Sequence, residues 1–307
     1  EKINDYTELL LPDDLTSDFA IVKDVQDGMP DEDCKNVEII GWLYQFYISE
    51  KKDEVFASKS KVMKADIPAA TQLFTPRWIV EYLVQNTLGK LWLQNRPKSR
   101  LREHMPFFVE YASGEAGDFL KFSSPEEIKF LDPASGSGHI LVYAFDLFCK
   151  IYEEEGYSTN EIPQLIIENN LYGFEIDERA AQLSGLALMM KAREYQRRIL
   201  RKGVQPNIYC FKDIQITNLE IKETFKSLNI TVSESLLFDL QLFQHSTNFG
   251  SLIFNHSKKE EISEIAQKLD YQKSQNNIFQ KSYIEEIINA INKLLIISNE
   301  YHCVVTN

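Results

Sequence analysis

The sequence predicts an α/β protein: a doubly wound, Rossmann-like parallel sheet preceded by an N-terminal helical region. From residue 127 onward, short apolar segments alternate with longer segments of helical periodicity. A glycine-rich turn joins the first apolar segment directly to the helix that follows. Residues 1–70 show helical patterning and no strand alternation. Strands that are joined by helices lie parallel in one sheet, so these observations together favour the α/β class.

Helices are expected on both sides of residue 70, which we take as the boundary between the helical region and a core domain of residues 71–307. Residues 37–48 (VEIIGWLYQFYI) form an aromatic-rich apolar stretch before a charged one at 50–54. We expect the aromatic residues to pack against another helix. Thr75 and Pro76 open a second helix, with threonine as the N-cap and proline as the first helical residue. Apolar spacing extends this helix to about Gly89.

The core domain is expected to contain four strands. The predicted strands, each short and apolar, are residues 128–131, 171–176, 207–211 and 303–306. Helical patterning covers residues 140–152, 164–169 (helical or irregular), 178–200 and 282–297. An insert at about 215–280 is longer than an ordinary crossover connection. Its polar part, residues 258–280, is expected to be either mobile or a helical hairpin.

The second half of the helix predicted at 178–200 is basic. We expect these residues to form a solvated face, with contact to a DNA backbone as the less favoured alternative: Lys191, Arg193, Arg197, Arg198, Arg201 and Lys202. His139 lies at the junction of the glycine-rich turn and the next helix. Core packing or a hydrogen bond at the start of the helix is the expected role of His139, in preference to catalysis.

The glycine-rich turn reads Asp-Pro-Ala-Ser-Gly-Ser-Gly at residues 132–138. Glycines let the backbone approach a ligand closely, and the helix that follows offers free N–H groups. A dinucleotide fingerprint would need a third glycine where the chain has Leu141, and no Gly-Lys-Ser/Thr follows for a phosphate loop. An acid at Asp132 would repel a pyrophosphate but suits a cationic ligand. A plain strand-to-helix turn with Asp132 as a cap remains the alternative.

Two further predicted strands also end near acids, at Glu175 and Asp213. In a parallel sheet the carboxyl ends of the strands share one edge, where ligands bind. Glu175 can accept both ribose hydroxyls, Ile176 can lie against an adenine, and Asp213 can accept from its amino group. Capping of the next helix suits Asp177 better than Glu175. Three acidic strand ends in register therefore predict a cofactor site.

Charge and cysteine content limit the other functions. The net charge of −13 argues against a broad phosphate-binding surface on this segment, so any grip on DNA would lie elsewhere. Four cysteines are scattered without a CxxC pair, and no metal site is expected. Such thiols are typical of a reducing cytoplasm, which is the expected location. No apolar run is long enough to span a membrane, so no membrane partner is expected.

Residues 132–138 resemble the cofactor loop of DNA methyltransferases that methylate amino groups, and residues 74–80 (FTPRWIV) resemble the segment before that loop in their gamma class. The resemblance implies a class I, S-adenosylmethionine-dependent methyltransferase fold. Thr75 and Pro76 would contact the methionine moiety, and Ile176 and Ile214 would flank the adenine. Glu175 would bind the ribose and Asp213 the adenine amine. The amino-acid part would lie on the loop residues Asp132, Pro133, Ala134, Ser135, Gly136, Ser137 and Gly138.

Three longer stretches, residues 39–56, 67–92 and 248–253 (NFGSLI), are similar to the large PglX-type methyltransferase of BREX phage-defence systems. This resemblance implies a site-specific DNA adenine-N6 methyltransferase of restriction-modification or phage defence. Its partners would be double-stranded DNA and other proteins of the defence system.

Asn307 matches the first residue of the family's catalytic Asn-Pro-Pro-Tyr motif, in which the asparagine accepts a hydrogen bond from the target amine of a flipped base. The chain starts at Glu1 and ends at Asn307, so we expect a fragment that binds cofactor without turnover. Methylation of RNA or of a protein glutamine by the same motif, and a pure cofactor-binding scaffold, remain as alternatives.

Overall fold

The computed structural model describes residues 12–63, 66–110, 118–273 and 278–307. Contacts divide the chain into two compact units, residues 1–39 and residues 40–307, and each is considered by itself. Within the first unit, helix α1 spans Ile21–Gly28 and a 3-10 turn, η2, spans Asp33–Lys35. α1 buries none of its residues. Among the described residues, no helix is both long enough and apolar enough to cross a membrane.

The predicted helix at 37–48 is confirmed, but it is longer than expected. α2 spans Glu38–Ala57 and continues through the charged stretch, whose Glu and Lys residues are good helix formers. The expectation that its aromatic residues pack against another helix is wrong for Phe46, which is 72% exposed. Tyr47 is 66% exposed, but its hydroxyl accepts a hydrogen bond at 3.0 Å from Arg179, which lies in another helix. Trp42 does find a ring partner, Phe74, at 4.4 Å between centroids.

Helical structure continues from α3 to α5 with one correction at the expected cap. The segments are α3 (Ile67–Thr71), α4 (Arg77–Val84), the π-turn η4 (Gln85–Gly89) and α5 (Lys90–Asn95). Pro76, and not Thr75, occupies the N-cap of α4. Thr75 is buried, and its hydroxyl oxygen accepts a hydrogen bond from the side chain of Asn307. A tertiary contact has therefore replaced the local cap that the sequence suggested.

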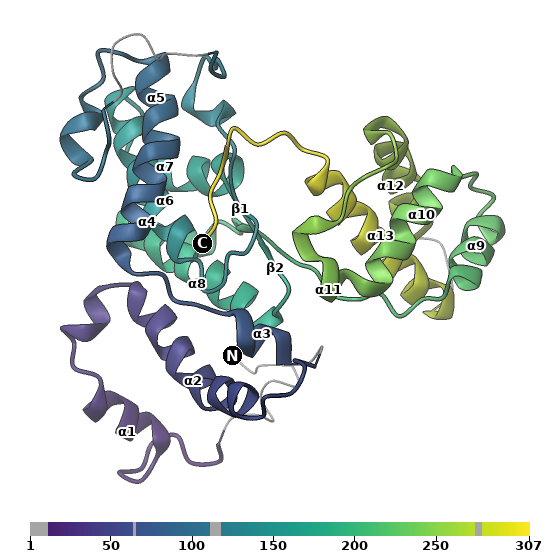
Figure 1. Cartoon of the computed structure of the whole chain (residues 1–307), viewed down its shortest axis with the longest axis horizontal. Helices are drawn as coiled ribbons and strands as arrows, with labels where there is room; N and C mark the ends of the chain where they lie inside the picture. The colour runs from purple at the N-terminus through teal and green to yellow at the C-terminus, as the bar shows by residue number, and fades with distance from the viewer. Residues whose placement is uncertain (1–11, 64–65, 111–117, 274–277) are drawn as a thin grey trace. The chain divides into compact units, whose positions relative to one another are not determined.

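Four parallel strands form one sheet in the order β3-β2-β1-β4, which confirms the predicted α/β class. Figure 1 labels the two central strands, β1 and β2. The strands are β1 (Phe130–Asp132), β2 (Leu171–Glu175), β3 (Asn207–Cys210) and β4 (Cys303–Val304). β1 and β2 are buried along their whole lengths, as expected for parallel strands covered on both faces. β1 pairs with β2 on one side and with β4 on the other. The chain runs outward from β1 through β2 to β3 and then returns to the opposite side of β1, so the strand order reverses at β1. This is the position at which open α/β sheets bind ligands.

The crossover helices agree with the sequence except at one end. They are α6 (His139–Glu154), α7 (Ile162–Leu165) with the π-turn η7 (Ile166–Asn170), and α8 (Glu178–Tyr195). Short 3-10 turns lie at Arg100–His104, Pro125–Glu127 and Ile199–Arg201. α8 ends at Tyr195 because the next residue, Gln196, adopts an extended backbone. The basic residues beyond α8 are exposed as expected, whereas Lys191 is half-buried between Asp146 and Glu194.

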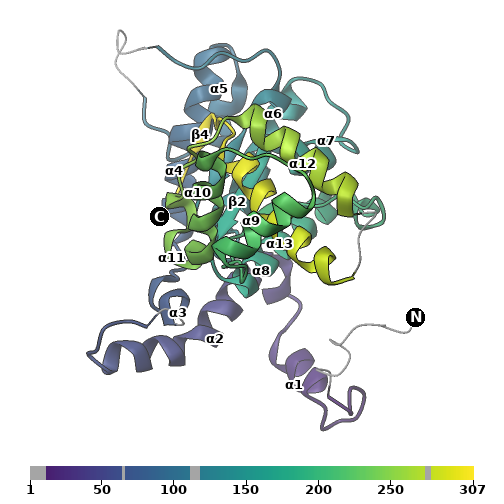
Figure 2. The ribbon, with the colours of Figure 1, turned by 90° about the vertical axis from the view of Figure 1, so that its right-hand side faces the viewer.

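The long connection between β3 and β4 is helical and is called the insert here. It comprises α9 (Asn218–Ser227), α10 (Glu234–Leu242), η9 (Phe243–His245), α11 (Ser246–Phe249), η10 (Gly250–Leu252), α12 (Lys259–Lys273) and α13 (Ile278–Ile297). α12 packs along α13 (Figure 2), so the polar stretch is helical but supplies only one arm of the pair; the other arm, α13, extends well beyond the predicted hairpin at 258–280. Residues 274–277 lie outside the described part. The apolar side chains of the insert share one core with Phe174 and Phe211 of the sheet region.

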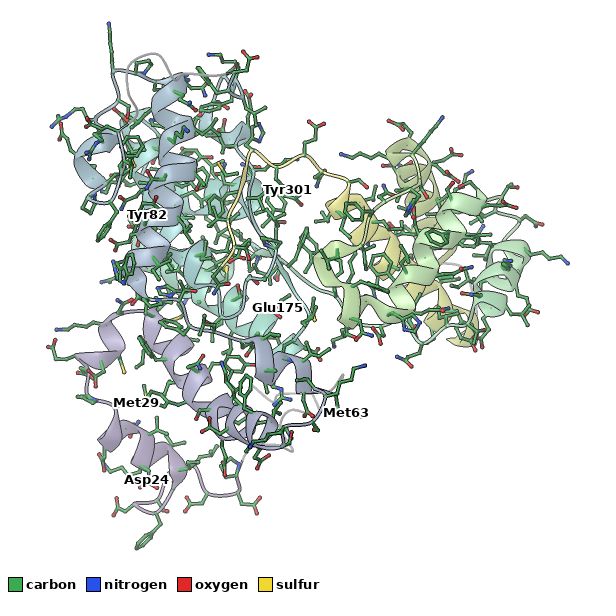
Figure 3. The ribbon with its side chains drawn as sticks, viewed as in Figure 1. Asp24, Met29, Met63, Tyr82, Glu175 and Tyr301 are labelled. Carbon is green, nitrogen blue, oxygen red and sulfur yellow. The ribbon has the colours of Figure 1, made fainter. Side chains whose placement is uncertain are left out.

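Tyr301 links the chain before β4 to the same core (Figure 3). Its ring lies edge-on to those of Tyr172 and Phe174, at 5.3 Å and 6.1 Å between centroids. Edge-to-face pairs of this kind contribute to packing beyond their buried area. The insert therefore leaves and rejoins the sheet through aromatic contacts around β2.

Asp239 is the polar anchor inside the insert. Its side chain is completely buried and accepts hydrogen bonds from the backbone N–H groups of His256 and Ser257 and from the hydroxyl of Ser257. The Nδ1 atom of His256 lies 2.8 Å from the same carboxylate. Asp239 thus fixes the turn that leads into α12.

Replacing Asp239 with alanine should lower the free energy of unfolding by about 3 kcal/mol, because several buried donors would lose their acceptor. Urea unfolding followed by circular dichroism measures the change. The control is Glu264→Ala, which removes only an exposed i,i+4 pair with Lys268 and should change stability by less than about 0.5 kcal/mol. Equal effects of the two variants would contradict the anchoring role.

Candidate functional site

A cavity of about 380 Å³ opens at the carboxyl ends of the sheet strands. Its floor is formed by the glycine loop (residues 132–138) and by the ends of β2 and β3. The other walls come from α2, from residues 71–74, from the insert and from Asn307. The size is within the range of small-molecule sites, and the position matches the ligand edge of a parallel sheet.

Two glycines shape the loop in different ways. Gly136 has φ +52°, and a Cβ there would meet nothing within 4 Å, so its left-handed backbone is what requires glycine. Gly138 has φ +87°, and a Cβ there would lie 2.6 Å from Oγ and 3.0 Å from Cα of Ser184. Glycine at 138 therefore allows α6 to start directly against α8.

Glu175 holds the loop against the sheet. Its Oε2 accepts a hydrogen bond from the N–H of Gly136 at 2.7 Å, and its Oε1 accepts from those of Ile176 and Asp177 at 2.8 Å and 3.0 Å. Figure 3 labels Glu175 where β2 ends. Burial raises the pKa of Glu175, while the three N–H groups act in the opposite direction. Asp177 instead caps α8, as the sequence suggested.

Asp132 lies beneath the loop and not on the cavity surface. Only 1% of the residue is exposed, and its Oδ1 accepts from the N–H of Ala134 at 3.1 Å. Burial, with a smaller contribution from the charge of Glu175, raises the pKa of Asp132 to about 7. Ser135 and Gly138 are also buried there, whereas Pro133, Ala134, Gly136 and Ser137 line the cavity.

Asp213 lies in an adjoining cavity of about 560 Å³. The two cavities share Ile67, Ile176 and Thr247 as lining residues. Oδ1 of Asp213 accepts from the N–H and the hydroxyl of Thr247, at 2.9 Å and 2.6 Å. The next residue, Ile214, is buried in the core that the sheet shares with the insert. Glu175 and Ile176 therefore line the main cavity, and Asp213 lines the adjoining one. Ile214 is buried in the core and lines neither cavity.

Asn307 reaches the cavity from the end of the strand next to β1. Its Nδ2 donates to the Thr75 hydroxyl and, at 3.5 Å, to the carbonyl of Leu73. Because the Leu73 carbonyl can only accept, these contacts assign the amide nitrogen to that side and leave Oδ1 as the acceptor. Pro76 starts α4 directly behind this contact.

α2 contributes a wall of the cavity that was not predicted from the sequence. Gly41, Tyr44 and Gln45 of α2 line the cavity. A Cβ at position 41 would lie 2.3 Å from the ring of Phe74 and 2.9 Å from Oγ of Ser137, so α2 packs directly on the loop. A glycine inside an otherwise apolar helix was the signal for this close approach.

Phe74 completes that wall by stacking on His139, with 4.4 Å between the ring centroids. This contact confirms the expected packing role of His139. Burial raises the pKa of Tyr44 to about 12, with the Gln72 side chain acting in the opposite direction, so the phenol is neutral near pH 7. It therefore presents a hydroxyl, not a charge, to the cavity.

The insert supplies a second wall that was not predicted as part of the site. Thr247, Asn248, Phe249, Gly250 and Leu252 all line the cavity. The contact of this segment with the cavity could not be predicted from its position in the chain, because the segment follows β3 by many residues. The one available signal was the similarity of residues 248–253 to a known family.

Comparison with known proteins finds similarity to methyltransferases. Residues 120–232 match the family model described as MmeI, DNA-methyltransferase domain. The match covers β1, the glycine loop, β2, β3 and α9.

Two curated relatives are each 42% identical to the chain. One is the adenine-specific methyltransferase BrxX of Escherichia coli O9:H4 (strain HS), aligned over 100% of this chain and 28% of the relative. The other is the adenine-specific methyltransferase PglX of Lacticaseibacillus casei (strain Zhang), aligned over 73% and 20%. A putative type II restriction enzyme and methyltransferase of Methanocaldococcus jannaschii is 24% identical over 57% of the chain and 16% of the relative.

The predicted resemblance is thereby confirmed: the chain is similar in sequence to adenine-specific methyltransferases. Within that class, the similarity is to the BrxX and PglX proteins. The chain spans about a quarter of the length of these two relatives.

The buried Asp132 should give the protein a distinctive pH dependence. Its pKa is about 7 in the folded state against 3.8 ordinarily, so between these values the folded state retains a proton that the unfolded state has lost. Stability should therefore fall as the pH rises through this window. Asp132→Asn cannot titrate, so the variant should gain stability relative to the wild type between pH 4.5 and 7. Urea unfolding at several pH values tests this, and a constant difference would contradict it.

Proposed function

We propose that this segment is the S-adenosylmethionine-binding part of a site-specific DNA adenine-N6 methyltransferase of phage defence, built on a Rossmann-like class I sheet. The observation that carries the proposal is the convergence of the glycine loop, Glu175 and Asn307 on one cavity. The 42% identity to adenine-specific methyltransferases supports the same activity. We further propose residues 71–307 as the core domain and residues 1–70 as a helical region preceding it.

The residues of the cavity fit this cofactor chemically. The amino-acid part would lie on the loop from Pro133 to Ser137, where Gly136 leaves the backbone open, with Thr75 and Pro76 behind Asn307. Glu175 would accept the ribose hydroxyls, and Ile176 would contact the adenine. Asp213 would accept from the adenine amine through the adjoining cavity. Asp132, Ser135, Gly138 and Ile214 would support these groups from beneath.

The acidic residues near the glycine loop suit a positively charged ligand. The cofactor carries a sulfonium and an ammonium group, and the buried carboxyls of Asp132 and Glu175 both bond to backbone N–H groups of the loop. A cation beside two buried carboxyls favours their ionised forms. When bound, the cofactor supplies a methyl group on an electrophilic sulfonium.

Asn307 would act on the methyl acceptor. With Nδ2 held by Thr75 and Leu73, Oδ1 can accept a hydrogen bond from the N6 amino group of a flipped adenine. The hydrogen bond makes the nitrogen a better nucleophile and holds it in line with the methyl group. Asn307 would thus hold the amino nitrogen for a methyl group that the bound cofactor would supply, and the methylated nitrogen would release its extra proton to solvent.

Cofactor binding is the first test, made with this chain. Calorimetry should detect binding of S-adenosylmethionine and of S-adenosylhomocysteine to the protein. Glu175→Gln should weaken binding about 10- to 100-fold, because the amide loses the charge and turns a donor toward backbone N–H groups. Glu103→Gln is the matched control, since Glu103 pairs with Arg100 at the surface and neither residue lines the two cavities, and it should bind within about twofold of the wild type. Absence of binding by folded wild-type protein would sink the proposal.

Methyl transfer is tested with the natural full-length protein. We expect methylation of adenine N6 in duplex DNA, and a loss of at least about 100-fold in Asn307→Ala with cofactor affinity unchanged within about twofold. Methylation of RNA or of a glutamine-containing peptide in place of DNA would instead support one of the other substrates of this chemistry.

A further inference from the structure

We propose that residues 247–252 of the insert, called the cover segment here, form the adenosine-side wall of the cofactor cavity. We propose further that Asp213 positions this wall through Thr247. The inference rests on the proposed function, because the adenosyl group of S-adenosylmethionine is the ligand that the wall would contact. It gives the insert a role in cofactor binding and gives Asp213 a structural task besides its contact with the adenine.

The cover segment is tied to the chain that leaves β3. The carboxylate of Asp213 accepts both donors of Thr247, the N–H at 2.9 Å and the hydroxyl at 2.6 Å. Just before the segment, the N–H of Ile214 donates to the carbonyl of Phe243 at 3.0 Å. The Gln244 side chain donates to the carbonyl of Ile216 at 2.8 Å. These bonds fix where the cover segment starts relative to the sheet.

The segment then approaches Ile176 as closely as a backbone can. Gly250 has φ +50° and ψ −130°, a conformation that residues other than glycine rarely adopt. A Cβ at this position would lie 3.2 Å from Cγ2 of Ile176. The conformation therefore favours glycine, and a side chain at this position would also crowd Ile176. Ile176 lines the main and the adjoining cavity, so the cover segment lies beside the residue proposed to contact the adenine.

The surface that the cover segment presents suits a purine nucleoside. Phe249 and Leu252 line the cavity with apolar side chains that are 43% and 69% exposed, which a bound ring could cover. Asn248 adds one amide that can both donate and accept. Apolar walls with a few polar groups are typical of sites for flat heterocycles. Asp213 is thus a positioning residue for this wall.

The test uses S-adenosylhomocysteine and 5′-methylthioadenosine, which share the adenosyl group; the second ligand lacks the amino-acid part. Thr247→Val removes the hydroxyl bond to Asp213 and should weaken both ligands about tenfold, the equivalent of about 1.4 kcal/mol. Thr247→Ser keeps the hydroxyl and should restore binding to within about twofold. Gly250→Ala should weaken both ligands more than Thr247→Val does. Calorimetry gives the dissociation constants, and circular dichroism confirms that each variant is folded.

Thr231→Val is the matched control, because Thr231 is an exposed threonine of the insert away from the cavity, and its binding should equal that of the wild type. Wild-type affinity in both folded Thr247→Val and folded Gly250→Ala would overturn the inference while leaving the proposed function intact. No binding of either ligand by the wild type would overturn both. An equal loss in Thr247→Val and Thr247→Ser would also count against the role of the Asp213 contact.

Discussion

The carboxylate of Glu175 is the contact on which the candidate site depends. It is 8% exposed, and it accepts N–H groups from the glycine loop and from the turn after β2. An isolated buried carboxylate would be costly, but one that accepts three backbone hydrogen bonds can be maintained. The loop after β1 and the turn after β2 are thereby held together at the edge where the cavity opens. A glycine at 136 completes the arrangement, because its left-handed backbone presents the N–H to this acid.

The sheet supplies only the floor of the cavity, and helices remote in the sequence supply the walls. α2 packs on the loop at Gly41, while Phe74 lies between Trp42 and His139. On the other side, the insert contacts Ile176 through Gly250. In both places a glycine allows helical structure to approach the floor more closely than a side chain would permit. The N-terminal helices and the insert are thus parts of the site as well as additions to the sheet.

Local patterns in the sequence were sufficient for the strands, the crossover helices and the glycine loop. Each of these depends on neighbours in the chain: buried apolar runs, helical periodicity, or glycines after a strand.

The predictions that were wrong had tertiary causes. Thr75 was predicted to be the N-cap of α4, yet its hydroxyl accepts a hydrogen bond from Asn307, at the far end of the chain. The aromatic residues of α2 suggest a buried helix, yet Phe46 remains exposed. Asp213 looks like a free ligand group, yet the insert bonds to it. Spacing along the chain contains no information on such partners.

Two buried carboxyls beneath one loop also connect the site to stability. Asp132 and Glu175 each lie in a medium where ionisation is costly, and the charge of Glu175 raises the pKa of Asp132 further. Without a cation nearby, the arrangement costs stability as the pH rises, because Asp132 gains its charge without a partner. A cationic ligand in the cavity would reverse that cost by favouring both charges. The acids that suit the ligand are thus the groups whose ionisation costs stability, so ligand binding and folding stability should be coupled through them.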